Sequence, residues 1–227
     1  MALTTAAGAD AIDEAQIKSL VLDAIRENPE IIREAITILQ ERDAAEQEAQ
    51  ALAALAESQD ALQNDPNAMV LGNPDGAITV VEFFDYNCGY CRRVFGDVKN
   101  LLASEDDVRL VMREWPILGE ASVFAARASL ASREQGKYAE FHDALMGHEG
   151  RATEAAVMQI AGDLGMDVDQ LKIDMEAPEV DAHIQASHAL TRSLGLNGTP
   201  AFVFGEQLVP GAIDLNTMKA MVDEMRG

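Results

Sequence analysis

The sequence predicts an α/β protein in which one small sheet carries a helical insertion and is preceded by an all-helical extension. Short apolar runs alternate with helix-forming segments in residues 66–227, and only helical signals occur over about 120–195. All aromatic side chains lie between Phe83 and Phe204. Because an extension without aromatic residues has little with which to build its own core, we expect residues 1–65 to form a helical stalk beside a single α/β domain.

The extension is expected to form two helices. Asp13 and Gln16 have the spacing of a capping box, and Asn28-Pro29 marks the start of the second helix. Apolar residues follow both start signals at helical spacing: they are Ile17, Leu20, Val21, Ile25, Ile31, Ile32, Ile36 and Leu39. A lone amphipathic helix cannot bury such a stripe against itself. The partner is either the domain of the same chain or further copies, and Ile and Leu at seam positions favour three or four strands.

Two groups of turn residues, Asp65-Pro66 and Asn73-Pro74-Asp75-Gly76, mark the join between the stalk and the domain. Four strands are expected, over residues 78–84, 108–112, 201–204 and 207–209. Helices are expected over residues 92–102, in several stretches within 120–194, and over 214–225. Asp167 with Gln170 predicts another capping box, and Pro178 and Gly195 have the positions of a helix start and a helix end.

The chemistry is expected at Cys88-Gly89-Tyr90-Cys91, which holds both cysteines of the chain. A structural disulfide here would close a very short loop and remove little entropy from the unfolded chain. Two thiolates supply half of a zinc tetrahedron, and no histidine lies beside them. The pair falls between a buried strand and a helix start, where backbone N–H groups favour a thiolate. We therefore interpret Cys88 as the exposed nucleophile and Cys91 as the resolving thiol.

The segment from Glu82 to Cys91, together with Thr199-Pro200, resembles the active-site strand and cis-proline loop of DsbA-type thiol–disulfide oxidoreductases. The resemblance covers about residues 69–227 and implies a thioredoxin-like domain with a helical insertion. The extension is similar to that of ScsC and Com1-like proteins, which are trimeric and periplasmic. The resemblance therefore implies a homotrimer through residues 1–65 and a membrane reductase partner of the DsbD/ScsB kind.

The same resemblance implies roles for single residues. Glu82, whose alternative interpretation is a strand edge facing water, is expected beneath the active site as the proton shuttle of Cys91, with a pKa raised by burial. Substrate contacts are expected at Thr199, Pro200, Gly89 and Tyr90. A cis Thr199–Pro200 bond would leave the backbone of Thr199 free for a substrate segment.

The residues that tune the redox poise depart from the oxidases of the family. Those oxidases carry Pro-His between the cysteines and Val before the cis-proline, whereas this chain has Gly89-Tyr90 and Thr199, as the isomerase DsbC does. Loss of the histidine makes the thiolate a better nucleophile and a poorer leaving group. We therefore expect a protein disulfide isomerase or reductase acting on misfolded or disulfide-containing proteins. The alternatives are a DsbA-like oxidase, a copper-tolerance protein whose thiolates hold Cu(I), and a stalk-driven binding protein.

Charge and composition exclude several classes of protein. Lys and Arg total 17 against 39 Asp and Glu, a formal net charge of −22, which disfavours nucleic acid and anionic membranes. No cofactor or metal ion is expected beyond the cysteine pair and the Cu(I) alternative. The first ten residues lack the basic start and apolar core of a signal peptide. A periplasmic location, implied by the resemblance, would mean that the signal is absent from this sequence.

Several other residues are expected to have structural roles only. Arg92 and Arg93 follow the cysteines and are expected to be solvated. The four histidines lie at spacings that do not stack on one helical face, so we expect surface or satisfied interior positions. Trp115 is expected to pack near the active-site region. The methionine stripe of the last helix, Met218, Met221 and Met225, is expected to fill the core.

Overall fold

The computed structural model describes residues 13–227, so the first twelve residues of the expected stalk lie outside the described residues. The chain divides into two compact units, Met1–Ala49 and Gln50–Gly227. The boundary lies earlier than the one at residue 66 expected from the sequence. The last turns of the second helix, as shown below, belong to the core of the second unit.

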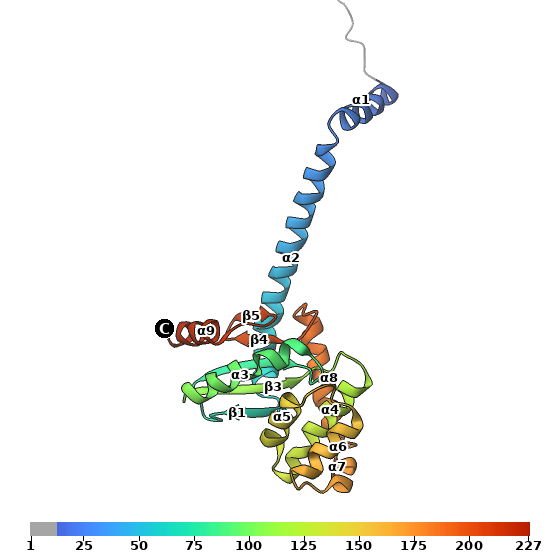
Figure 1. Ribbon diagram of the computed structural model, residues 1–227. Coiled ribbons are helices and arrows are strands. Elements are labelled where there is room, and N and C mark those ends of the chain that lie inside the picture. The colour runs from blue at the N-terminus through green and yellow to red at the C-terminus, as the bar shows by residue number, and fades with distance from the viewer. Residues whose placement is uncertain (1–12) are drawn as a thin grey trace, which may run out of the picture. The chain divides into compact units, whose positions relative to one another are not determined.

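The first unit is helical throughout its described part (Figure 1). Helix α1 (Glu14–Glu27) begins with the expected capping box, in which the Asp13 carboxylate accepts the N–H of Gln16 at 2.8 Å. Asn28 does not cap the second helix as expected: its side chain donates to Ala24 O at 3.0 Å and so satisfies the end of α1. The unit also contains the first part of α2 (Glu30–Gln63).

The apolar stripe of this unit is exposed. No residue of α1 is buried, and Ile25 is half-buried. Nine large apolar side chains of the unit are between 42% and 63% exposed: they are Ile17, Leu20, Val21, Leu22, Ile31, Ile32, Ile36, Ile38 and Leu39. No helix in the part of the chain that the structure describes is long and apolar enough to cross a bilayer. The stripe therefore has the pattern of a face that lacks its partner.

The second unit is built on a five-stranded sheet of order β1-β3-β2-β4-β5. β2 and β3 are parallel, and the other neighbours are antiparallel. The strands are β1 (Met69–Gly72), β2 (Ile78–Phe84), β3 (Val108–Glu114), β4 (Ala201–Phe204) and β5 (Gln207–Pro210). β1 was not expected from the sequence.

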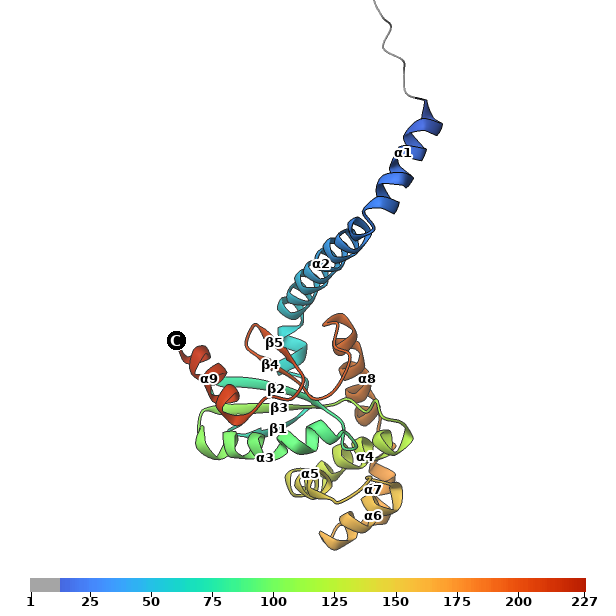
Figure 2. The same ribbon diagram turned by 45° about the horizontal axis from the view of Figure 1, so that its top comes forward.

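Helices cover both faces of the sheet (Figures 1 and 2). They are α3 (Gly89–Ser104), α4 (Glu120–Ala131), the 3₁₀ turn η1 (Ser132–Gln135), α5 (Tyr138–Gly147), α6 (Glu154–Asp163), α7 (Val168–Asp174), α8 (Pro178–Ser193) and α9 (Leu215–Arg226). The helices α4–α8 form the expected insertion. At the start of α7 only half of the expected capping box exists, since Asp167 accepts the N–H of Gln170 but the Gln170 side chain donates to Asp174.

The two faces have separate cores because side chains alternate along β2. Val80 and Phe84 pack on one face with α3, α9 and the insertion, and Met218 lies fully buried there. On the other face Phe83 packs with the last turns of α2 and with the end of α8. Leu55, at 1% exposure, anchors α2 in this second core.

Further contacts fix the end of α2 and the residues that follow it. Leu62 is fully buried, and Gln59 donates its side-chain amide to Gly205 O at 3.0 Å. Asp65 forms an ion pair with the fully buried Arg113. Residues 50–65, which the sequence assigns to the stalk, are therefore structural parts of the sheet-containing unit.

A buried histidine extends this ion pair. His183 lies 3.2 Å from Asp65 Oδ2 through its Nδ1 and 2.8 Å from Glu114 Oε2 through its Nε2. Burial disfavours the charged imidazole, but the hydrogen bonds to the two carboxylates raise the pKa of His183 overall. Tyr138 completes the cluster by donating to Glu114 Oε1 at 2.6 Å. The cluster joins the segment after α2 to β3, α5 and α8.

Candidate active site

The cysteine motif lies where β2 ends and α3 begins. Cys88 is the N-cap of α3, with extended backbone angles of φ −80° and ψ 118°, and Cys91 lies within the first turn. Cys91 is fully buried. Cys88 is the more accessible of the two, but its exposure is 6%, so the prediction of an exposed nucleophile is wrong. The reason is the Thr199–Pro200 loop: in the thiol form, Cys88 Sγ donates to Thr199 O at 3.2 Å.

The two thiols differ strongly in acidity. Hydrogen bonds from the Cys91 thiol, from Thr199 and from the backbone N–H groups of Cys91 and Tyr90 outweigh burial and lower the pKa of Cys88 to about 5. The thiolate form exchanges its bond to the Thr199 carbonyl for these donors. Burial raises the pKa of Cys91 far above its usual value, and the Cys88 sulfur and Glu82 raise it further. At neutral pH one sulfur is ionised and its neighbour remains a thiol.

Glu82 lies in the middle of β2 between Met112 of β3 and Phe202 of β4. Its exposure is 2%, so the alternative of an edge position facing water is wrong. Burial raises the pKa of Glu82 to about 8. Its charge also acts on Cys91, whose pKa it raises. A carboxyl group with this pKa can both release and accept a proton near neutral pH.

The residues expected to contact substrate line the approach to Cys88. The Thr199–Pro200 peptide bond is cis, and Pro200 O accepts the N–H of Gly211 at 2.9 Å. A Cβ atom placed on Gly89 would meet no neighbouring atom. Tyr90 is 58% exposed, and the Arg93 guanidinium lies over its ring, 4.9 Å from the centroid. Open space and an exposed ring thus follow Cys88 in the chain.

The insertion holds the motif through residues to which the sequence gave no role. Tyr86 reaches into the insertion, where its hydroxyl lies 2.6 Å from Ser129 Oγ and 2.9 Å from His142 Nδ1. Burial lowers the pKa of His142 to about 4, so this ring is neutral at pH 7. The sequence gives only a weak signal for this role of Tyr86, because its partners Ser129 and His142 lie more than forty residues away in the chain.

Arg92 and Asn87 add further ties to the insertion. Arg92 donates to the backbone carbonyls of Tyr86 at 2.8 Å and His148 at 2.9 Å, and also to that of Gly150. It is therefore not the solvated residue expected from the sequence. Asn87 donates to Ser122 Oγ at 3.1 Å and accepts the N–H of Ala152 at 2.8 Å. The first turn of α3 is anchored on the insertion from both sides.

The remaining single residues lie away from the cysteines or inside the core. Trp115 packs edge-on against Phe83, with ring centroids 6.4 Å apart, and donates to His188 at 3.1 Å. Within residues 13–227 no group of three or more His, Cys, Asp or Glu side chains is arranged to hold a metal ion.

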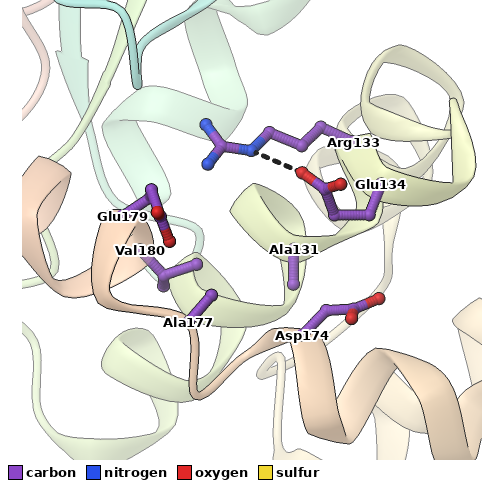
Figure 3. Close-up of a pocket in the computed structure, with 7 residues that line it drawn as sticks. All are labelled: Ala131, Arg133, Glu134, Asp174, Ala177, Glu179 and Val180. Carbon is purple, nitrogen blue, oxygen red and sulfur yellow. Dashed lines mark ion pairs between the residues drawn. The ribbon is translucent and has the colours of Figure 1, made fainter.

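A pocket of about 370 Å³ lies in the insertion, between η1, α7 and α8 (Figure 3). Its polar lining is mainly acidic, with one arginine that pairs with its neighbour, Arg133 Nε lying 3.3 Å from Glu134. The lining residues are Ala131, Arg133, Glu134, Asp174, Ala177, Glu179 and Val180. None of them belongs to the cysteine motif or to the cis-proline loop, so the pocket is separate from the candidate active site.

Two family descriptions match the chain. Residues 79–223 match the DSBA-like thioredoxin domain, and residues 13–46 match the copper resistance protein ScsC N-terminal domain. The first match covers the cysteine motif, the insertion and the strands from β2 to β5, but not β1. The second falls within the unit whose apolar stripe is exposed.

Solved structures show the same architecture. A thioredoxin-like oxidoreductase from Silicibacter pomeroyi DSS-3 is 58% identical, covers 74% of this chain and 97% of that chain, and has a TM-score of 0.73. Proteus mirabilis ScsC in a transitional conformation is 32% identical over 93% of this chain and 95% of that chain, with a TM-score of 0.70. A periplasmic thioredoxin-like protein from Salmonella enterica serovar Typhimurium is 29% identical over 73% and 94% of the two chains, with a TM-score of 0.65.

The curated relatives are much longer than this chain. The Na(+)/H(+) antiporter NhaA of Herminiimonas arsenicoxydans is 28% identical over 158 residues, which are 69% of this chain and 25% of the antiporter. The chain thus spans about a quarter of the length of the relatives it matches. The similarity extends over part of each protein.

Proposed function

Because the chain belongs to the family of DSBA-like thioredoxin domains, we propose that it is a protein disulfide isomerase and reductase that acts through Cys88 and Cys91. The observation that carries the proposal is the contrast between the two thiols: the pKa of Cys88 is lowered to about 5, whereas that of Cys91 is raised. The thiolate is the nucleophile in disulfide exchange. Cys88 therefore attacks, and Cys91 stays protonated until it is needed.

The exchange proceeds in two steps. The Cys88 thiolate attacks one sulfur of a client disulfide, forms a mixed disulfide and releases the other client sulfur as a thiolate. In isomerisation, a second client thiolate attacks the client sulfur of the mixed disulfide and sets Cys88 free. In reduction, the Cys91 thiolate attacks Cys88 Sγ, which releases the reduced client and leaves a Cys88–Cys91 disulfide. As the net result of these steps, two electrons have passed from the two cysteines of the protein to the client disulfide.

Reduction requires Cys91 to lose its proton, and Glu82 is the group proposed to take it. Its pKa of about 8 gives it mixed protonation near neutral pH. Its charge acts on Cys91 directly. Isomerisation does not need this step, so Glu82 governs the balance between the two outcomes.

Isomerase or reductase activity is favoured over oxidation by the residues around the nucleophile. A pKa of about 5 for Cys88 lies between about 7 in thioredoxin and about 3.5 in the strong oxidant DsbA. Gly89-Tyr90 provides no cation between the cysteines, so the thiolate is a poorer leaving group than in the oxidases. A reduction potential near −120 mV in equilibrium with glutathione would instead favour the oxidase.

The extension is proposed to join three chains in the periplasm. The exposed stripe of α1 and the start of α2 needs a partner, and the match of residues 13–46 to the ScsC N-terminal domain supports self-association. Several active sites on one assembly raise their local concentration around a misfolded client. The Salmonella neighbour is described as periplasmic, which supports that location, and a DsbD/ScsB-like membrane reductase would return the pair to the dithiol.

Copper tolerance is the alternative suggested by the family that residues 13–46 match, the copper resistance protein ScsC N-terminal domain. Residues 13–46 contain no Cys, His or Met, the side chains that Cu(I) prefers. A Cu(I) site would therefore lie outside residues 13–46. A site at the two thiolates would require Cys91 to give up its proton. Tight Cu(I) binding by the reduced protein with negligible thiol exchange would support this alternative.

Refolding of scrambled ribonuclease, run beside oxidation of reduced ribonuclease, tests the proposal. The reduced protein should restore ribonuclease activity to the scrambled form and should add little to the oxidation of the reduced form. Cys88→Ser should lose the refolding activity. Full refolding activity of Cys88→Ser would point to a binding protein, and fast oxidation without refolding would point to an oxidase.

A further inference from the structure

Two loops meet at one edge of the sheet, and one of them has no role so far. β2 and β3 are parallel, with Phe84 opposite Glu114, so the segments that follow them lie at the same edge. The cysteine motif follows β2. The segment Trp115–Gly119 follows β3 and leads into α4.

Asp85 links the two loops through a single carboxylate. Its exposure is 2%. One oxygen accepts the N–H of Asn87 at 2.7 Å, and the other accepts the N–H groups of Ile117 at 2.9 Å and Leu118 at 3.0 Å. Its backbone carbonyl accepts the N–H of Cys88 at 3.0 Å. A carboxylate is suited to this task because it can accept at both oxygens.

The segment held by Asp85 is apolar and exposed. Ile117 and Leu118 are 38% and 43% exposed, and Val123 in α4 is 38% exposed. Val123 follows Ser122, whose hydroxyl accepts from Asn87. Apart from Tyr90 in the motif, the other exposed large apolar side chains of the described unit Gln50–Gly227 are Leu52 and Ile173. Exposed apolar side chains therefore gather on the residues tied to the motif, which is typical of a contact surface.

We propose that Asp85 is a positioning residue that holds Ile117 and Leu118 beside Cys88, and that this pair selects client disulfides with apolar flanking residues. The inference rests on the proposed exchange reaction. When a client sulfur bonds to Cys88, the residues next to that client cysteine lie about 3.5 Å further along the chain for each position. The proposal places these client residues on the segment that Asp85 holds.

Asp85→Asn is the substitution that separates positioning from bulk. The amide has the size of the carboxylate, but one of its two ends is an NH₂ donor. Whichever way the amide turns, its NH₂ group faces a backbone N–H that a carboxylate oxygen accepts in the wild type. In one orientation Ile117 and Leu118 lose their acceptor, and in the other Asn87 loses its acceptor, so the link between the two loops is broken in both while the volume at position 85 stays filled.

The test uses two synthetic peptides that differ only beside an intramolecular disulfide, one with leucines and one with serines as flanking residues. Single-turnover reduction by the pre-reduced protein needs no other reductant, because Cys88 and Cys91 supply both electrons. The wild-type protein should react faster with the leucine peptide. In Asp85→Asn the ratio of the two rate constants should fall by about tenfold, the order of one apolar contact.

Two further variants keep the result decisive. Asp167→Asn makes the same chemical change at a carboxylate that also accepts two backbone N–H groups, at the start of α7, and should leave the ratio unchanged. Ile117→Ser with Leu118→Ser alters exposed side chains, so it tests the surface even if Asp85→Asn does not fold, and it should lower the ratio equally. An unchanged ratio in either test variant overturns the inference. Failure of the reduced wild-type protein to react with oxidised glutathione would instead overturn the proposed function.

Discussion

The two units of the chain differ in the exposure of their apolar side chains: those of the first unit are largely exposed, and those of the second form a buried core. In residues 13–49, Leu20 and Leu39 are 63% and 57% exposed, whereas in the unit Gln50–Gly227 Leu55 is 1% exposed. Leu39 and Leu55 belong to the same helix, α2. A continuous helix therefore need not belong to one structural unit. Each turn belongs to the unit whose side chains it packs against.

Both cysteines lie in the second unit, so we expect disulfide exchange to depend on that unit. Substitution of Cys88 tests this and should have the largest effect on activity. Cys88→Ser removes the thiolate nucleophile and should lower the rate of disulfide exchange by several orders of magnitude. Cys91→Ser keeps the nucleophile but removes the resolving thiol, so mixed disulfides with client should accumulate. Mass spectrometry of the protein after incubation with a disulfide peptide distinguishes the two variants. Retained exchange in Cys88→Ser would show that the cysteine motif is not the active site.

Truncation tests where one unit ends and the other begins. A chain of residues 66–227 lacks Leu55 and Leu62, each worth about 2–5 kcal/mol as a buried leucine. It also leaves the buried Arg113 without Asp65, at a cost of about 3–5 kcal/mol. Together these losses approach the whole stability of a typical domain, about 5–15 kcal/mol. We expect this chain not to fold, and residues 50–227 to fold and to keep reductase activity.

The measurement is thermal unfolding followed by circular dichroism. A matched pair within α2 refines it: Leu62→Ala should lower the free energy of unfolding of the sheet unit by about 2–5 kcal/mol. Leu39→Ala, the same change at a position 57% exposed, should leave that transition in place. Equal transitions for residues 50–227 and 66–227 would return the boundary to residue 66.

Glu82 provides a smaller effect that is confined to the second unit. Its pKa is raised from 4.5 to about 8, so between these values the unfolded chain is ionised there while the folded protein is protonated. The free energy of unfolding therefore falls as pH rises through this window, by up to about 1.4 kcal/mol per pH unit. Glu82→Gln removes this loss and should be more stable than the wild type at pH 8 by a few kcal/mol.

Denaturant unfolding of the reduced proteins at pH 4 and pH 8 measures this difference. The two proteins should be similar at pH 4, where Glu82 is protonated in both states. Glu206→Gln alters an exposed carboxylate in the turn between β4 and β5 and should match the wild type at both values. A Glu82→Gln protein without extra stability at pH 8 would mean that Glu82 ionises freely.

Much of this contrast could be predicted from the sequence. β2, the place of the cysteine motif and the helical insertion were expected because their signals are local: a β-branched run, a cysteine spacing and helix caps. The exposure of Cys88 was predicted wrongly, because it depends on Thr199, which lies 111 residues away. The roles of Asp85 and Arg92 depend in the same way on distant backbone groups. The division of α2 was not predictable, since apolar side chains follow helical spacing in both parts.

A substitution in the first unit should have the smallest effect on the stability of the sheet unit. It tests directly whether the exposed stripe serves self-association. Ile36 is 49% exposed, and its burial between chains would contribute about 1.5–3 kcal/mol per copy. Ile36→Ser should therefore weaken self-association by tenfold or more, while Gln40→Ser, one turn further along the same helix, should not. Light scattering across a concentration series measures the association. The unfolding transition of the sheet unit should stay the same in both variants. If Ile36→Ser leaves the oligomer intact, the stripe does not form the interface, and the refolding activity proposed for the assembly loses its structural basis.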